Sequence, residues 1–100
     1  MSVYLIVNSD VKDKKAHAEY QQKVPAIVRK HGGEYLVRGG DFEVIEGDWQ
    51  PVRLILFRFP DRESVKALFS DPEYAPYKAR RQQIAHTQIV MVDGCDSGER

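Results

Sequence analysis

Four charged residues lie on or beside stretches of the sequence that otherwise look buried: Arg38, Glu46, Arg53 and Arg81. A charge beside a core normally needs an opposite charge or a ligand, because its removal from water is costly. Two arginines could hold a substrate carboxylate, since the planar guanidinium offers a fork of donors that matches two carboxylate oxygens. The alternative is an internal ion pair of Glu46 with Arg38 or Arg53 that ties a loop to a sheet.

Aromatic and imidazole side chains could complete such a site. We expect Tyr20 and Tyr74 on helices facing a sheet, where their hydroxyls either act on a substrate carbonyl or are tips of packed rings. His17 precedes Tyr20 by one helical turn and is either exposed or placed to exchange a proton near neutral pH. Trp49 is either a pocket wall or a plug at the end of the fold. The candidate catalytic residues are His17, Tyr20 and Glu46, and the candidate ligand-binding residues are Arg38, Trp49, Arg53, Tyr74 and Arg81.

Other kinds of chemistry have little support in the sequence. No His-x-x-x-His or Cys-x-x-Cys spacing occurs, so we expect neither a metal site nor a cofactor. Gly39-Gly40 indicates a turn that needs positive φ rather than a phosphate cradle, because no helix start follows. No Gly-x-Ser-x-Gly elbow is present, which argues against covalent acyl catalysis.

Length and charge point to a single small domain. The chain has 100 residues with 15 basic and 15 acidic side chains interspersed, so we expect neither nucleic acid nor a membrane as partner. Cys95 is the only cysteine, which excludes an internal disulfide and fits the cytoplasm. The apolar run 3–7 is too short for a signal peptide. We expect one domain over residues 1–94 and a polar, mobile tail over 95–100.

The order of elements predicts an α+β fold. The hydrophobic patterns indicate the following elements: a strand at 3–7, a helix at 13–31 with a kink or break at Pro25, strands at 34–38, 42–45 and 52–59, a helix capped by Asp61, a helix opened by Asp71 or by a Ser70–Glu73 capping box, and a strand at 89–92. This is a split βαβ pattern with helices on one face of an antiparallel sheet. Strands 3–7 and 52–59 are apolar on both faces, so we expect a second copy to cover the open face.

One stretch carries a family resemblance. Arg38-Gly39-Gly40 followed by Glu46-Gly47-x-Trp49-x-Pro51-x-Arg53 resembles a bacterial domain-of-unknown-function family in the dimeric α+β barrel superfamily, and the similarity covers about residues 3–94. The resemblance implies a ferredoxin-like protomer whose sheet pairs with that of a second protomer, with a pocket between sheet and helices. Arg58 and Leu68-Phe69 depart from the family pattern, which usually has an acidic residue and an aromatic pair at these positions.

These observations lead to three hypotheses about function. The first is a homodimer that binds a small organic acid or aromatic metabolite and performs proton-transfer chemistry without a cofactor. The second is a non-catalytic structural or interaction protein. The third, a cofactor-free monooxygenase, rests on the resemblance alone, because the superfamily also holds isomerases, haem enzymes and proteins without known activity. Whether the protein is an enzyme stays open at this stage.

Overall fold

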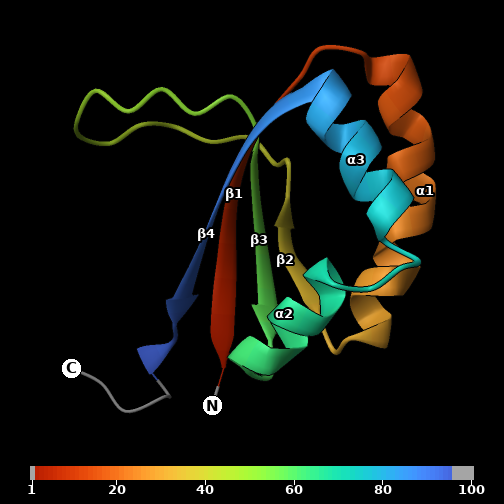
Figure 1. Cartoon of the computed structure of the whole chain (residues 1–100). Coiled ribbons are helices and arrows are strands. Elements are labelled where there is room, and N and C mark those ends of the chain that lie inside the picture. Colours follow the sequence, from red (N-terminus) through yellow and green to blue (C-terminus); the bar gives the residue numbers. More distant parts are fainter. Residues whose placement is uncertain (1, 96–100) are drawn as a thin grey trace.

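The computed structural model describes residues 2–95, which form one sheet covered on one face by helices (Figure 1). The elements in chain order are β1 (Val3–Val11), α1 (Lys14–Lys30), β2 (Glu34–Arg38), β3 (Leu54–Phe59), α2 (Arg62–Phe69), α3 (Ala75–Ile84) and β4 (Ala85–Asp93). The strand order is β2-β3-β1-β4, and all neighbours are antiparallel. The predicted α+β, ferredoxin-like sheet with helices on one face is confirmed.

The core lies between the helices and the inner face of the sheet. Alternate residues of β1 point toward the helices, and β1 pairs with β3 so that Leu5 lies opposite Phe57 and Val7 opposite Ile55. Phe59 at the end of β3 has no exposed surface. Its ring packs so close to the backbone that a Cβ at Gly33 would lie 2.6 Å from it. A glycine at that position therefore lets the chain enter β2 over the core.

Helix α1 extends through its proline without a break. The carboxylate of Asp13 caps its first turn by accepting from the N–H of Ala16 at 3.0 Å. Pro25 is buried in the middle of α1, and the helix continues beyond it to Lys30 as a single element. The alternative of two separate segments is therefore wrong. Asp61 caps α2 as predicted, accepting from the N–H of Ser64 at 2.8 Å.

The predicted strand at 42–45 is wrong. Residues 40–52 form no strand and instead leave the sheet as a long excursion, called the arm below, on the side opposite to the helices (Figure 1). Phe42 and Val44 alternate with acidic residues as a strand would, but no neighbouring strand of the protomer pairs with them. A β-strand pattern without a pairing partner is not sufficient to form a strand.

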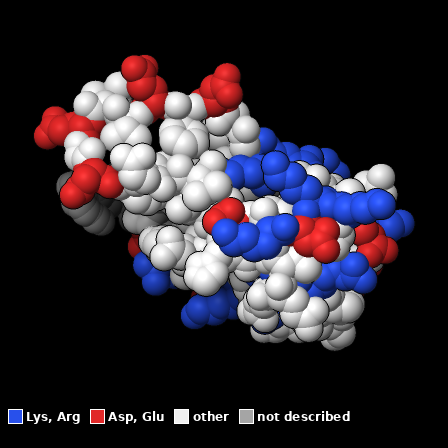
Figure 2. Space-filling view, turned by 90° about the horizontal axis from the view of Figure 1, so that it is seen from above, with Lys and Arg blue, Asp and Glu red and all other residues white. Residues whose placement is uncertain are grey.

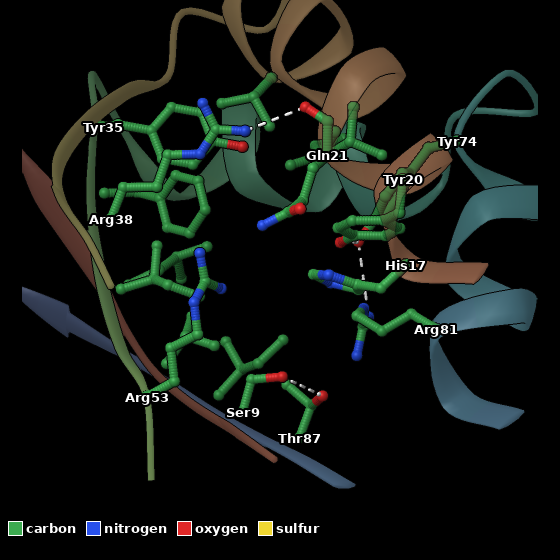
Figure 3. A pocket seen from close by; sticks show the side chains of 18 of the residues that line it. Ser9, His17, Tyr20, Gln21, Tyr35, Arg38, Arg53, Tyr74, Arg81 and Thr87 are labelled. Atoms are coloured by element: carbon green, nitrogen blue, oxygen red, sulfur yellow. Dashed lines mark hydrogen bonds between the residues drawn. The ribbon is translucent and has the colours of Figure 1, made fainter. Parts of the chain in front are cut away.

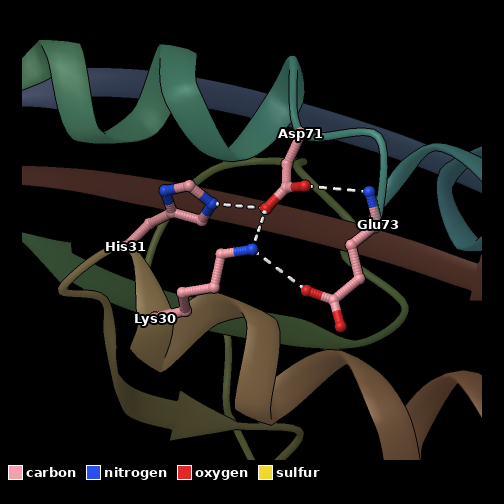
Figure 4. Close-up of polar contacts among 4 residues, drawn as sticks. All are labelled: Lys30, His31, Asp71 and Glu73. Carbon is pink, nitrogen blue, oxygen red and sulfur yellow. Dashed lines mark hydrogen bonds and ion pairs between the residues drawn. The ribbon is translucent and has the colours of Figure 1, made fainter.

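Asp71 caps the turn that precedes α3 and also joins this turn to the end of α1 (Figure 4). The predicted helix start at Asp71 is only partly right, because residues 72–74 form a turn and α3 itself begins at Ala75 without a side-chain cap. The carboxylate of Asp71 accepts from Lys30 Nζ at 2.8 Å and from His31 Nε2 at 2.7 Å. The N–H of Glu73 donates to the other oxygen at 2.8 Å. We call Lys30, His31, Asp71 and Glu73 the helix lock.

Cys95 is the last residue that the structure describes. Cys95 is exposed and carries a free thiol. The rest of the predicted tail, residues 96–100, lies outside the described residues. No helix among residues 2–95 has the length and apolar character needed to cross a membrane.

Candidate ligand-binding pocket

A cavity of about 60 Å³ opens between the inner face of the sheet and helices α1 and α3. Its floor is apolar and is made by Leu5, Val7, Ile55 and Phe57 from the two central strands. Its mouth is polar and lies at the end of the sheet where β1 ends and β3 begins (Figure 3). The volume has room for about four to six groups of the size of a water molecule.

Two arginines reach the mouth from the base of the arm. Arg38, the last residue of β2, lies over the ring of Tyr35 at 4.7 Å and donates to the carbonyl of Gln21 at 2.9 Å. Arg53 immediately precedes β3, and its side chain points into the open space (Figure 3). Gly39 has a φ of 75°, and a Cβ there would lie 2.6 Å from Arg53 Nε. The predicted turn therefore has a second use, because its glycine makes room for Arg53.

Arg81 is the arginine most fully removed from water. It lies on α3 and is only 7% exposed. Its Nη2 lies 3.4 Å from the hydroxyl of Tyr74, which in turn lies 2.9 Å from the hydroxyl of Tyr20. Its Nε is buried and has no hydrogen-bond partner. Since a guanidinium keeps its proton, the site holds a positive charge with unused donor capacity.

His17 faces the same space from α1. Its ring stacks on that of Tyr20 with centroids 5.2 Å apart, and the side chain points into the cavity (Figure 3). Burial lowers the pKa of His17, and the positive charge of Arg53, followed by those of the other pocket arginines, lowers it further. Burial and the neighbouring Tyr74 raise the pKa of Tyr20 well above its ordinary value. At neutral pH His17 is therefore a neutral base, and Tyr20 keeps its proton.

The pocket is lined by cations without a counter-charge. Among the residues that the structure describes, no Asp or Glu lines it. The predicted alternative, an ion pair of Glu46 with Arg38 or Arg53, is not seen within the protomer. Glu46 and Trp49 lie on the exposed arm, outside the pocket. The other predicted site residues, which are His17, Tyr20, Arg38, Arg53, Tyr74 and Arg81, come together around this one cavity.

Three polar residues of the pocket escaped the sequence analysis. Ser9 and Thr87 lie opposite each other on β1 and β4, with their hydroxyl oxygens 3.2 Å apart. Ser9 continues the inward alternation of Val3, Leu5 and Val7, so a longer predicted strand would have found it. Gln21 follows Tyr20 on α1 and carries no distinguishing signal in the sequence. No group of three or more His, Cys, Asp or Glu within residues 2–95 could hold a metal ion.

Comparisons with known proteins place the chain in a family. The family model "Domain of unknown function (DUF1330)" matches residues 2–95, and the chain belongs to that family. A search of curated proteins found no match.

Solved structures share the fold at low sequence identity. A protein of unknown function from Rhodopseudomonas palustris is similar with a TM-score of 0.74 at 13% identity, over 93% of this chain and 82% of that chain. SnoaB, a cofactor-independent oxygenase from Streptomyces nogalater, gives 0.63 at 10% identity over 93% and 92%. A Mycobacterium tuberculosis protein gives 0.58 at 17% identity over 94% and 95%. These neighbours establish the ferredoxin-like α+β fold of the protomer alone.

Proposed function

We propose that this DUF1330 protein is a homodimer that binds a small organic acid in the pocket of each protomer and exchanges a proton with it without a cofactor. One observation carries the proposal: Arg81 is buried without a carboxylate partner and has an unused Nε–H donor. A buried cation normally has a partner, and an anionic ligand is the partner that the pocket lacks.

The charge and the size of the pocket limit which ligands can bind. The carboxylate would accept hydrogen bonds from Arg53 and Arg81, whose forks of donors suit it better than an ammonium would. The remainder of the ligand would lie on the apolar floor formed by Leu5, Ile55 and Phe57. With a cavity of about 60 Å³, an acid of the size of pyruvate fits within it, and an aromatic acid would extend through the mouth.

The proposed chemistry uses His17 as the base. A neutral imidazole can take a proton from the carbon next to a carbonyl group. The enolate that results is an anion, and three nearby arginines would stabilise it in the low-dielectric pocket. Tyr20 keeps its proton at neutral pH and can donate to the same oxygen. No step of this proton exchange needs a cofactor.

The homodimer would cover the outer face of the sheet. That face carries the residues of β1, β3 and β4 that point away from the helices, among them Ile6, Leu56, Val90 and Val92. Val90 is 58% exposed and Val92 43% exposed in the protomer. An apolar sheet face is commonly covered by a second sheet at about 10 Å. We propose that the second sheet belongs to another copy, which also agrees with the family resemblance.

A second candidate activity uses the same residues. SnoaB, which shares the fold, is a cofactor-independent oxygenase. If His17 takes a proton from a substrate carbon, a carbanion forms on the substrate, and the arginines would stabilise it. We propose that this substrate carbanion is the species that would react with oxygen. Oxygen uptake measured with an electrode during incubation with an activated phenol would favour this activity, whereas proton exchange without oxygen uptake would favour the first.

Calorimetric titration tests the binding proposal. Pyruvate and benzoate are the charged probes, and benzamide is the neutral analogue of benzoate. We expect Arg81→Gln to weaken carboxylate binding by about 30-fold or more, because truncating one partner of a buried charge pair costs about 2 kcal/mol or more. Arg80→Gln is the matched control, since Arg80 is exposed and lies next to Arg81 on α3. Equal binding of benzoate and benzamide would overturn the anion site.

Proton exchange is tested separately. NMR in D₂O follows the loss of the methyl proton signal of pyruvate as deuterium enters. We expect the protein to accelerate this exchange and His17→Gln to abolish the acceleration while the binding of pyruvate is retained. If pyruvate binds but its proton exchange is not accelerated, the catalytic proposal is wrong and the non-catalytic hypothesis is favoured.

A further inference from the structure

The arm is the one large feature of the fold that the pocket does not explain. Residues 40–52 leave the sheet beside the mouth of the pocket and extend past the outer face, away from the helices (Figure 1). Every residue of the arm up to Gln50 is exposed. The exposed fraction is 86% for Ile45 and 57% for Trp49. Apolar side chains that protrude in this way mark a contact surface.

The base of the arm is held firmly. The side chain of Asn8 on β1 accepts from the N–H of Val52 at 2.8 Å and from the N–H of Arg53 at 3.3 Å. At the other end, the N–H of Gly39 donates to the carbonyl of Leu54 at 2.8 Å. These bonds fix the direction in which the arm leaves the sheet.

The arm also has a strong charge. It contains Asp41, Glu43, Glu46 and Asp48 and no Lys or Arg, and within the described protomer none of these carboxylates has an ion pair. Figure 2 shows acidic side chains on the protruding part and Lys and Arg over the opposite part of the molecule. The arm is therefore an acidic, apolar segment without a complementary surface on its own protomer.

We propose that each arm crosses to the second copy and covers the mouth of that copy's pocket, with Glu46 facing Arg38 at the rim, so that Arg53 and Arg81 stay free for the ligand, and with Trp49 as part of the lid. This inference rests on the proposed homodimer. About six residues out and six back give the arm a reach of about 20 Å. A second sheet packed on the outer face lies about 10 Å away. The tip of the arm therefore reaches the layer between the partner's sheet and helices, where the pocket lies.

The charged side chains at the two ends of the partner's sheet indicate which end the acidic arm meets. At the mouth end, Arg38 at the rim has no carboxylate partner within the described protomer. At the opposite end of the sheet the charges are already paired, as in Arg58 with Glu34 and Arg62 with Asp93. The acidic arm therefore favours a two-fold axis along the strands, which brings the two mouth ends together and exchanges both arms at once. In this arrangement Glu46 and Trp49, which lie outside their own pocket, become residues of the neighbouring one.

Trp49 gives an intrinsic readout because it is the only tryptophan of the chain. In a dimer with exchanged arms its emission is shifted to the blue, and acrylamide quenches it weakly. Val90→Asp places a charge on the outer face and should give a monomer. We expect Trp49 of that monomer to be quenched severalfold more strongly than in the wild type, while far-UV circular dichroism stays the same. Equal quenching in a wild-type dimer and a folded monomer would overturn the arm exchange.

Cross-linking tests the same contact without a monomer. In a Cys95→Ser background, an Ile45→Cys chain is mixed with a longer, tagged Gln21→Cys chain, and the two are oxidised. We expect a disulfide between the two chains of different length. Lys66→Cys on α2, at the far end of the sheet, is the matched control and should not cross-link. Cross-linking to Lys66→Cys instead of Gln21→Cys, or none to either, would overturn the proposal.

A wild-type protein that sediments as a monomer would overturn the homodimer as well, whereas a dimer with an exposed Trp49 would overturn the arm exchange alone.

Discussion

The helix lock and the pocket are two clusters of charged side chains with opposite arrangements. In the helix lock, one carboxylate, Asp71, accepts from a lysine, a histidine and a backbone N–H, so that each charge has a partner (Figure 4). In the pocket, three arginines face one cavity that no carboxylate of the described chain lines (Figure 3).

The difference separates a structural role from a binding role. Paired charges hold elements together, and their loss costs stability. Unpaired charges of one sign repel each other and cost stability as they stand, so the fold keeps them where a ligand supplies the missing charge. Variants of the helix lock should therefore change stability, and variants of the pocket should change binding.

The largest loss of stability is expected in the helix lock. Asp71→Ala removes the acceptor of Lys30, of His31 and of one backbone N–H, so it should lower the melting temperature more than any of the other substitutions proposed below. Benzoate binding by the folded variant should equal that of the wild type. Asp48→Ala on the arm is the matched control, because that carboxylate has no ion pair within the protomer. Similar melting temperatures for both variants would contradict the role of the lock.

Gly39→Ala should have the next largest effect. Its φ of 75° is strained for alanine, and a Cβ would lie 2.6 Å from Arg53 Nε. We expect a loss of about 1 to 2 kcal/mol in the free energy of unfolding, measured by urea denaturation, together with weaker carboxylate binding. Gly40→Ala is the control, since a Cβ there meets nothing within 4 Å. Unchanged binding by Gly39→Ala would show that the position of Arg53 is unimportant.

Acid should weaken the helix lock through Asp71. Lys30, then His31 and the N–H of Glu73, hold the pKa of Asp71 well below its ordinary value. The stabilisation is thus complete above the unfolded-state pKa of about 4 and is lost as pH falls toward the folded-state pKa. The urea concentration at the midpoint of unfolding should decrease for the wild type as the pH drops below about 4. For Asp71→Asn this midpoint concentration should decrease less steeply. Parallel curves would contradict the assignment.

Arg53→Gln should leave stability nearly unchanged. It removes one of three like charges and no ion pair, so we expect the free energy of unfolding to change by less than about 0.5 kcal/mol or to rise slightly. An internal ion pair would instead make this variant strongly destabilised. Thermal unfolding without added ligand separates the two outcomes.

The smallest expected effect is a change in the pKa of His17 in the Arg53→Gln variant. Burial contributes most to its lowered pKa and Arg53 contributes next, so Arg53→Gln should raise the pKa of His17 only part of the way toward its ordinary value. NMR titration of the ring protons measures it, with Arg80→Gln as control. An unchanged pKa in Arg53→Gln would place Arg53 farther from His17 than the structure has it.

Local patterns predicted the fold well because they record burial. The short apolar run 3–7 identified β1, although its last four residues, 8–11, were missed because Ser9 is polar and its partner Thr87 is distant in sequence. Asp71 carries a capping pattern and accepts from the N–H of Glu73, but its contacts with Lys30 and His31 join residues that are distant in sequence, so local sequence could not show them. Local sequence also could not show that the arm lacks a strand to pair with.

The site was predicted as a set of residue types and not as an arrangement. His17, Tyr20 and Arg53 were identified as candidates for chemistry, and the structure places them around one cavity. The internal pair of Glu46 with an arginine was the favoured alternative, because sequence spacing does not show whether a loop folds back on the sheet. The burial of Arg81 beside the exposed Arg80 depends on the tilt of α3, which only the fold determines.

The proposed anion site depends above all on Arg81. NMR of the arginine Nε–H groups, recorded while benzoate is added to uniformly ¹⁵N-labelled protein, observes the donor itself. We expect the Arg81 signal, assigned by its loss in Arg81→Gln, to move downfield and to saturate, whereas benzamide leaves it in place. An Arg81 signal that does not move although benzoate binds, or that moves equally with benzamide, would contradict the account.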